Sequence, residues 1–420
     1  MLFSTLFIGF LLLLAYKFKP KLDMPAPGPP ETERRTPRGT LSAKGFRYVQ
    51  QSGGTVEFEI TAASVTEGRG GTKLLTEPVM TIPGQGKAWA REGSFEPSTQ
   101  TLRIWDDAHI SHAAGWDAAS SGFRLTPEGE IVSEGDVALS RLDARGRAEL
   151  LRYQRKAEVA YLEGKVRFEQ ADKRLTCSRI IVDFSLHSGQ IAGPVEFTSL
   201  QGDLRAPEGT LALSEKNELT GVSLGSPCTG EGPRGSFSAR TLVADIGEKG
   251  ALSALHLRRD AAVTLSGPAP STLRTALLDL VPGERESWAW NAPQALTVER
   301  EGGKADAASG KGEFGGSAPL SADLAGPVRG KDARGTFRGD RAALKGGDWT
   351  LSGRAAVERP ADWVKADAIT YRQDGSSSAS GNVTGWRRPE GQPEFTFASD
   401  KAHAGAGGFT ALLAGSARAS

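Results

Sequence analysis

The chain has 420 residues and a nearly even charge balance, with 51 Lys and Arg against 50 Asp and Glu. This balance disfavours a general nucleic-acid binder, which usually carries a basic excess, so we expect no nucleic-acid partner. The 52 glycines exceed average usage. Because they separate short runs in which apolar and polar residues alternate, they predict an all-β chain.

The first residues predict a membrane anchor. Residues 2–16 are uncharged and largely apolar, and Lys17, Lys19 and Lys21 follow them. A spanning helix needs roughly 17–25 residues, so we expect a short transmembrane signal anchor over 1–19, with Lys17 reaching the interface. A cleaved signal peptide is the alternative, and it is weakened because no A-x-A-like cleavage site follows the apolar core.

The anchor leads into a stiff linker over residues 20–40, in which six prolines favour extended backbone. The lysines after the anchor conflict with the tendency of positive residues to stay on the cytoplasmic side. That tendency is a bias rather than a rule, and we expect the C-terminal bulk in the periplasm and a single pass through the inner membrane.

After the linker, short segments with the alternating pattern of a β-strand recur along the chain. The stretch AYLEGKVRFEQ (160–170) predicts a hairpin that turns at Glu163-Gly164, with one apolar and one charged face. Similar segments recur at irregular spacing, each with a glycine followed two positions later by an apolar residue. They are EGDVALS (134–140), GPVEFTS (193–199) and GNVTG (381–385). Two segments, 147–156 and 271–281, are interpreted as helices.

The chemistry-bearing residues do not form an enzyme motif in a plausible context. No Gly-Lys is followed by Ser or Thr, as a phosphate-binding loop requires. His109 and His112 lie near two aspartates, but on a strand the i, i+3 spacing directs them to opposite faces, so a metal pair is disfavoured. We therefore predict a protein that is not an enzyme and has no cofactor and no metal.

The two cysteines, Cys177 and Cys228, leave two alternatives open. They are either unpaired, half-buried thiols or a disulfide, and a disulfide would require an oxidising compartment.

Several of these phrases together resemble the LptC/LptA (OstA-like) family of lipopolysaccharide export. The resemblance rests on the short anchor and on GKAWAREGSFEPSTQTLRIWDDAHI, IVSEGDVALS, RAELLRYQRKAEVAYLEGKVRFEQADKRLTCSRIIVDFSLHSGQIAGPVEF and ADAITYRQDGSSSASGNVTGW. It implies a folded-over antiparallel sheet (a β-jellyroll or β-taco), with an LptC-like body at 41–225 and an OstA-like, partly low-complexity extension at 226–420.

The resemblance also implies function and partners. The chain would receive the lipid A acyl chains of lipopolysaccharide in an apolar β-groove and pass them toward the outer membrane. An inner-membrane ABC transporter would do the work, and an LptA-like bridge protein would dock by edge-strand addition. The length of the chain departs from the family pattern, and it leaves open whether a separate LptA is needed.

The groove candidates are alternate apolar residues of the best strands, for which ordinary sheet core is the competing interpretation. They are Leu102, Ile104, Val137, Leu139, Val159, Tyr161, Val166, Phe168, Ile180, Val182, Phe184, Val195 and Phe197.

Two other functions fit the same pattern. One is a periplasmic or surface β-solenoid that binds or cleaves polysaccharide, with exposed aromatic residues on one face. Trp288 and Trp290 are the only tryptophans at strand spacing. The other is an envelope tether with a fully packed core and no ligand.

Overall fold

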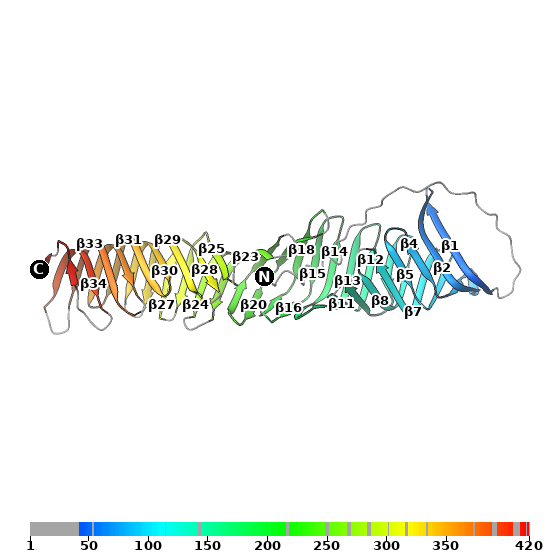
Figure 1. The fold of residues 1–420 in the computed structure, drawn as a ribbon, viewed down its shortest axis with the longest axis horizontal. Helices are drawn as coiled ribbons and strands as arrows, with labels where there is room; N and C mark the ends of the chain where they lie inside the picture. The colour runs from blue at the N-terminus through cyan, green and yellow to red at the C-terminus, as the bar shows by residue number, and fades with distance from the viewer. Residues whose placement is uncertain are drawn as a thin grey trace. The chain divides into compact units, whose positions relative to one another are not determined.

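The computed structural model describes residues 42–419, except 53, 114, 142–143, 201, 216–217, 248–251, 267–269, 284–286, 301, 316–317, 333–334, 373, 389–392, 406–411 and 417. These residues form an all-β protein of antiparallel strands (Figure 1). The expected anchor and linker lie outside the described residues. Within the described part, no helical segment has the length and hydropathy needed to cross a bilayer.

The described residues fall into two compact units, an N-terminal unit that ends at Ser223 and a C-terminal unit that begins at Leu224. A short piece that begins at Ile246 belongs to the N-terminal unit. The N-terminal unit contains one short 3-10 turn, η1 (Arg69–Gly71), and strands β1 to β19. These strands are β1 (Ser42–Ser52), β2 (Thr55–Glu67), β3 (Lys73–Thr76), β4 (Val79–Ile82), β5 (Gly86–Trp89), β6 (Glu92–Glu96), β7 (Thr101–His112), β8 (Asp117–Leu125), β9 (Glu130–Ser133), β10 (Val137–Arg141), β11 (Ala144–Ala148), β12 (Leu150–Gln154), β13 (Val159–Gln170), β14 (Lys173–Asp183), β15 (Ser188–Ala192), β16 (Val195–Ser199), β17 (Gly202–Ala206), β18 (Gly209–Leu213) and β19 (Leu219–Leu224).

The C-terminal unit contains the remaining strands of the described residues. They are β20 (Cys228–Gly232), β21 (Gly235–Ala239), β22 (Thr241–Ile246), β23 (Leu252–Leu265), β24 (Ser271–Pro282), β25 (Ser287–Ala292), β26 (Leu296–Arg300), β27 (Gly303–Ala307), β28 (Ser309–Gly315), β29 (Ala318–Asp332), β30 (Thr336–Lys345), β31 (Asp348–Arg359), β32 (Asp362–Tyr371), β33 (Ser377–Arg387), β34 (Phe395–Ala404), β35 (Leu412–Ala414) and β36 (Arg418–Ala419).

Long strands of the N-terminal unit bend in the middle and pair with different short strands on either side of the bend. The first part of β7 pairs with β6 and its last part with β5. In the same way, β13 pairs with β12 before its bend and with β11 after it. The bends divide the sheet of this unit into two halves, and each long strand contributes one segment to each half. Half-sheet A contains the short strands β4, β5, β10, β11 and β16, and half-sheet B contains the short strands β3, β6, β9, β12 and β15.

The repeated phrases of the sequence mark these bends. Each contains a glycine with positive φ, such as Gly135, Gly164, Gly193 and, in the C-terminal unit, Gly381. A side chain is disfavoured in this conformation, which explains the glycine. The apolar residue two positions later points inward and is at most 1% exposed at Val137, Val166, Val195 and Val383. The repeat is therefore a bend unit that turns the strand and buries a side chain at the turn.

The predicted hairpin at 160–170 is wrong. Residues Val159–Gln170 form one continuous strand, and Gly164-Lys165 is a bulge opposite the single residue Ser178. A bulge adds a residue and bends a strand without ending it, so its glycine looks like a turn in the sequence.

The two predicted helices are also wrong, for the same reason. Segment 271–281 lies in β24, where Leu273 and Thr275 point inward before a break and Leu278 and Leu280 after it. Thr275 and Leu278 are three residues apart, so the break gives an alternating strand the spacing that is typical of a helix. Segment 147–156 likewise spans β11 and β12, with Glu149 at the bend between them.

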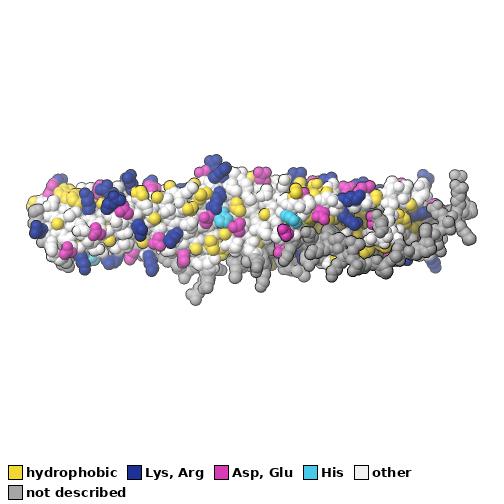
Figure 2. Space-filling model, turned by 90° about the horizontal axis from the view of Figure 1, so that it is seen from above, with side chains coloured by type: hydrophobic (Ala, Val, Ile, Leu, Met, Phe, Trp, Pro, Cys, Tyr) yellow, Lys and Arg dark blue, Asp and Glu magenta, His cyan; other side chains and the backbone are white. Residues whose placement is uncertain are grey.

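The core is made of alternate residues from these strands, and the outer faces carry the charge. The largest fully buried side chains of the N-terminal unit include Phe95, Phe123 and Phe168, whereas the C-terminal unit buries many alanines around Trp290. Basic and acidic side chains are interspersed over the face shown in Figure 2. This pattern agrees with strands that have one apolar and one solvated face.

Candidate functional site

An apolar cavity of about 90 Å³ lies in the N-terminal unit, and residues of both half-sheets line it. Half-sheet A contributes apolar side chains of β4, β5, β7 and β10, and half-sheet B contributes those of β8, β9, β12 and β13. The apolar lining residues are Met80, Ile82, Ala88, Ile110, Trp116, Leu125, Ile131, Leu139, Leu151, Tyr153, Ala160 and Phe184. An interior space with this lining suits an aliphatic ligand.

The charged residues that line the cavity are basic. They are Lys87 and Arg155, with the titratable His112, and among the described residues no Asp or Glu lines the cavity. Burial lowers the pKa of His112 to about 4, so its ring is neutral at pH 7. The ring stacks on Trp116 at a centroid distance of 5.2 Å. The cavity therefore combines an apolar interior with positive charge and suits an amphiphile with an anionic head group.

Most of the predicted groove residues are buried, but few line this cavity. All thirteen except Val159 and Tyr161 are at most 8% exposed. Leu139 and Phe184 line the cavity, and the other buried residues pack elsewhere in the core. Val159 and Tyr161 are half-buried because the inward set of β13 is Ala160 and Leu162. The guanidinium of Arg152 lies 4.4 Å from the centre of the Tyr161 ring, on that other face.

Sequence reasoning missed most of the cavity lining. Met80 and Ile131 lie in strands of four residues, which are too short to show alternation. Leu151 belongs to a segment interpreted as helical, and Ala160 was assigned to the opposite face by the supposed hairpin. If Gly164 had been interpreted as a bulge, Ala160 would have been predicted to point inward. The inward residues of β13 are even-numbered both before and after the bulge.

The two histidines of β7 point to opposite faces, as their strand spacing predicts. His109 donates a hydrogen bond from Nε2 to Asp107 Oδ1 at 2.9 Å and stacks on Trp89, whereas His112 lines the cavity. Among the residues that the structure describes, no group of three or more His, Cys, Asp or Glu side chains could hold a metal ion.

The two cysteines are unpaired in the structure, and both are buried rather than half-buried. Burial raises the pKa of Cys177 and of Cys228 to about 12. Because the thiolate is the reactive form, neither side chain is a candidate nucleophile.

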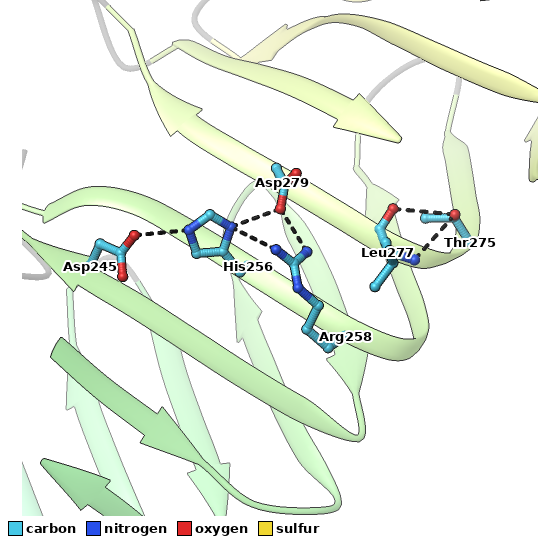
Figure 3. A network of polar contacts seen from close by, with 6 residues as sticks. All are labelled: Asp245, His256, Arg258, Thr275, Leu277 and Asp279. Atoms are coloured by element: carbon cyan, nitrogen blue, oxygen red, sulfur yellow. Dashed lines mark hydrogen bonds and ion pairs between the residues drawn. The ribbon is translucent and has the colours of Figure 1, made fainter. Parts of the chain in front are cut away.

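A polar network on the C-terminal unit connects three strands (Figure 3). His256 of β23 is hydrogen-bonded through Nδ1 to Asp279 of β24 at 2.7 Å and through Nε2 to Asp245 of β22 at 2.9 Å. Arg258 forms an ion pair with Asp279 at 2.6 Å. Thr275 lies nearby but bonds to the backbone of Leu277 and Ala295. The hydrogen bonds and ion pair therefore connect strands β22, β23 and β24.

This network predicts a pH-dependent contribution to stability. Partial burial opposes charge on His256, but its hydrogen bonds to Asp279 and Asp245 outweigh this effect and raise its pKa above the usual value. A raised folded-state pKa contributes stability that is present below about pH 6.5 and is lost as the pH rises through the folded-state pKa. We expect His256→Asn to remove this dependence in unfolding midpoints measured from pH 5.5 to 8.5. His403→Asn, which replaces an exposed histidine of β34, is the control. An unchanged pH profile for His256→Asn would contradict the raised pKa of His256.

Two short segments match enzyme motifs by spacing and not by structure. GVSLG (221–225) has the spacing of a hydrolase nucleophile motif, but its first four residues lie in strand β19 and Gly225 directly follows the strand. GEGPRG (230–235) has the spacing of a dinucleotide-binding motif but lies in the hairpin of β20 and β21. Both motifs require a strand that turns into a helix, so neither match carries catalytic meaning here.

The tryptophan pair of the C-terminal unit forms no exposed platform. Trp290 is 2% exposed and donates a hydrogen bond from Nε1 to the Ser321 carbonyl at 3.2 Å. Trp288 is half-buried and lies opposite Phe314. Because one ring is buried in the core and the other is half-buried, the two rings do not form a shared exposed surface on which a sugar could stack.

No protein-family model matches the chain, and a search of curated proteins finds no match for its sequence.

Proposed function

We propose that the chain is a membrane-anchored periplasmic component of lipopolysaccharide export, which takes acyl chains into the space between half-sheets A and B. The observation that carries the proposal is the apolar cavity lined from both half-sheets, whose charged lining residues are basic. In this proposal the sheet is folded over along its row of bends, as in a β-jellyroll of the LptC/LptA kind. At about 90 Å³ the cavity holds only the end of an acyl chain, so the two half-sheets would have to separate to receive the lipid A acyl chains, and the phosphorylated head group would meet Arg155 and Lys87.

The energetics of acyl chains favour a receiving groove that does no work itself. Each buried CH₂ contributes about 0.8 kcal/mol, so several acyl chains leave a bilayer only if comparable apolar surface receives them. A groove offsets that cost but cannot drive net transport. The work would come from an inner-membrane ABC transporter that binds nucleotide, with the anchor at 1–19 keeping the chain beside it.

One strand edge supports the proposed docking of a bridge protein. Among the described residues, the edge strand β1 pairs with β2 and with no other strand. Its second edge therefore offers backbone groups to an added strand, as in β-augmentation. An LptA-like partner would extend the sheet here or at the C-terminal unit.

Site-specific photo-crosslinking in cells tests the proposal. With photoreactive residues at Leu151 and Phe184, which line the cavity, we expect lipopolysaccharide adducts. Probes at Phe168, which is buried away from the cavity, and at exposed Arg167 are expected to give none. A folded, membrane-bound protein without adducts at Leu151 and Phe184 would favour the packed tether or the glycan binder.

Filling the cavity gives a second readout. Ala160→Phe places a ring in the cavity, and we expect it to reduce the lipid adduct at Phe184 by about tenfold or more, because a phenyl ring displaces several methylene groups. Ala138→Phe adds the same ring at an exposed position of β10 and is the matched control. Equal adduct yields in the two variants would show that the lipid binds outside this cavity.

A further inference from the structure

A second depression, of about 540 Å³, lies on the outer face of the C-terminal unit. It crosses β25, β28, β29, β30 and β31, which are adjacent antiparallel strands. Their register places Asn291, Lys311 and Asp323 in one transverse row that continues to Ala343 and Thr350. The depression is thus built on a rigid sheet surface with a defined order of side chains.

Small residues make the floor of this depression, and long ones flank it. Gly310, Ala325 and Ala343 line it together with Lys311 and Arg341. A Cβ at Gly310 would point into the core, where it would come within 2.9 Å of Cδ2 of the buried Leu324, so only the backbone of this residue borders the depression. On the outer face, the short side chains of Ala325 and Ala343 leave the hollow beside the long side chains of Lys311 and Arg341.

The two basic side chains are available to a ligand. Within the described part of the chain, neither Lys311 nor Arg341 takes part in a salt bridge within 4.0 Å. Their neighbours differ, since Arg338 on the same strand pairs with Glu358 and Arg354 on β31 pairs with Asp340. Asp323 is the one acidic residue among those that line the depression. The site therefore carries a net positive charge and favours an anion.

The other polar residues that line the depression are neutral hydrogen-bonding groups. Asn291 offers an amide, and Thr350 and Ser352 offer hydroxyls. Thr350 Oγ1 also lies 3.3 Å from Thr370 Oγ1 on the next strand, and the row continues to Ser378. None of the described residues that line the depression is aromatic, so these residues provide no stacking surface of the kind on which single-stranded nucleic acids bind.

We infer that this depression binds an anionic saccharide, that is, a sugar carrying a carboxylate or a phosphate. Lys311 and Arg341 would hold the acid group, and Asn291, Asp323 and the hydroxyls of Thr350 and Ser352 would bind sugar hydroxyls. The inference does not rest on the proposed function, because the acyl cavity lies in the other unit and has different lining residues.

Ligand-observed NMR on the full-length protein tests this inference with four probes: glucuronic acid, glucose 6-phosphate, glucose and inorganic phosphate. We expect both acidic sugars to bind at least about tenfold more tightly than glucose and than inorganic phosphate, since charge-assisted and sugar hydrogen bonds both contribute. Inorganic phosphate equal to glucose 6-phosphate would overturn the sugar part. Glucose equal to glucuronic acid would overturn the role of charge, and binding of none would overturn the site.

Variants then locate the binding. Lys311→Gln and Arg341→Gln are each expected to weaken binding of glucose 6-phosphate by about tenfold, because each removes a charge-assisted hydrogen bond. Arg338→Gln removes an exposed positive charge from the same strand but outside the depression, and it should leave binding within about twofold. If all three variants weaken binding equally, the acid group is attracted by the general charge of the face and the assigned site is wrong.

Discussion

Replacing Phe168 with alanine is expected to lower the free energy of unfolding of the N-terminal unit by about 3–5 kcal/mol, the usual cost of removing a buried phenyl ring. Phe168 is 2% exposed and lies opposite Leu175 of β14. On its other side the ring covers Gly146 of β11, where an added Cβ would come within 2.7 Å of the ring atom Cδ1. Because the ring fills the space that this glycine leaves, no neighbour is placed to replace it.

The measurement is hydrogen exchange of the amides of β13 and β14 in the full-length protein, since the two units need not unfold together. Arg167→Ala is the matched control: the adjacent side chain points outward and pairs with Glu169, so we expect a loss of at most about 1 kcal/mol. Equal losses in the two variants would mean that β13 does not bury Phe168 in solution.

Replacing Gly193 with alanine is expected to destabilise the same unit by about 2–4 kcal/mol. Gly193 has φ of +81°, which costs an L-residue about 1 kcal/mol. In addition, the new Cβ would lie 2.6 Å from Ser178 Cβ, which cannot move without shifting the bend of β14. Hydrogen exchange across β14 to β16 gives the magnitude.

Two further variants separate the backbone strain from the clash. Gly84→Ala has the same strain, with φ of +71°, but an added Cβ there has nothing within 4 Å, so we expect a loss of only about 1 kcal/mol. Ser178→Gly should recover part of the stability that Gly193→Ala loses, because it removes the side chain that clashes. A double variant no more stable than Gly193→Ala alone would refute the packing of these bends.

The strand content and the direction of most apolar side chains could be predicted from local pattern. Alternation predicted that Leu102 and Ile104 lie in a strand and point to one face, and both are buried in β7. Where alternation was interrupted, the prediction failed. At Gly164 a bulge was taken for a turn, and the break in β24 was taken for the period of a helix. A glycine with positive φ looks the same in the sequence whether the chain reverses or only bends.

The candidate sites were less predictable than the strands. An apolar residue that lines a cavity and one that fills a core have the same sequence signal, and only Leu139 and Phe184 of the predicted groove line the cavity. The depression around Lys311 and Arg341 could not be predicted from the sequence for another reason. Its members come from five strands, and their proximity follows from the register of those strands and not from their spacing in the chain.

The sequence by itself determined that this protein is built of antiparallel strands with one apolar and one charged face, because side-chain alternation is a local property of extended backbone. Glycine marks some of the bends, such as Gly135, Gly164 and Gly193, because positive φ disfavours a side chain, but the bends of β7 and β23 use Asp106-Asp107 and Arg259-Asp260 instead. Only the tertiary structure decided which apolar residues surround a cavity, that its charged lining residues are basic, and which polar residues share the outer depression. These features depend on strand pairing across long sequence separations, and that pairing leaves no local signal in the residues it brings together.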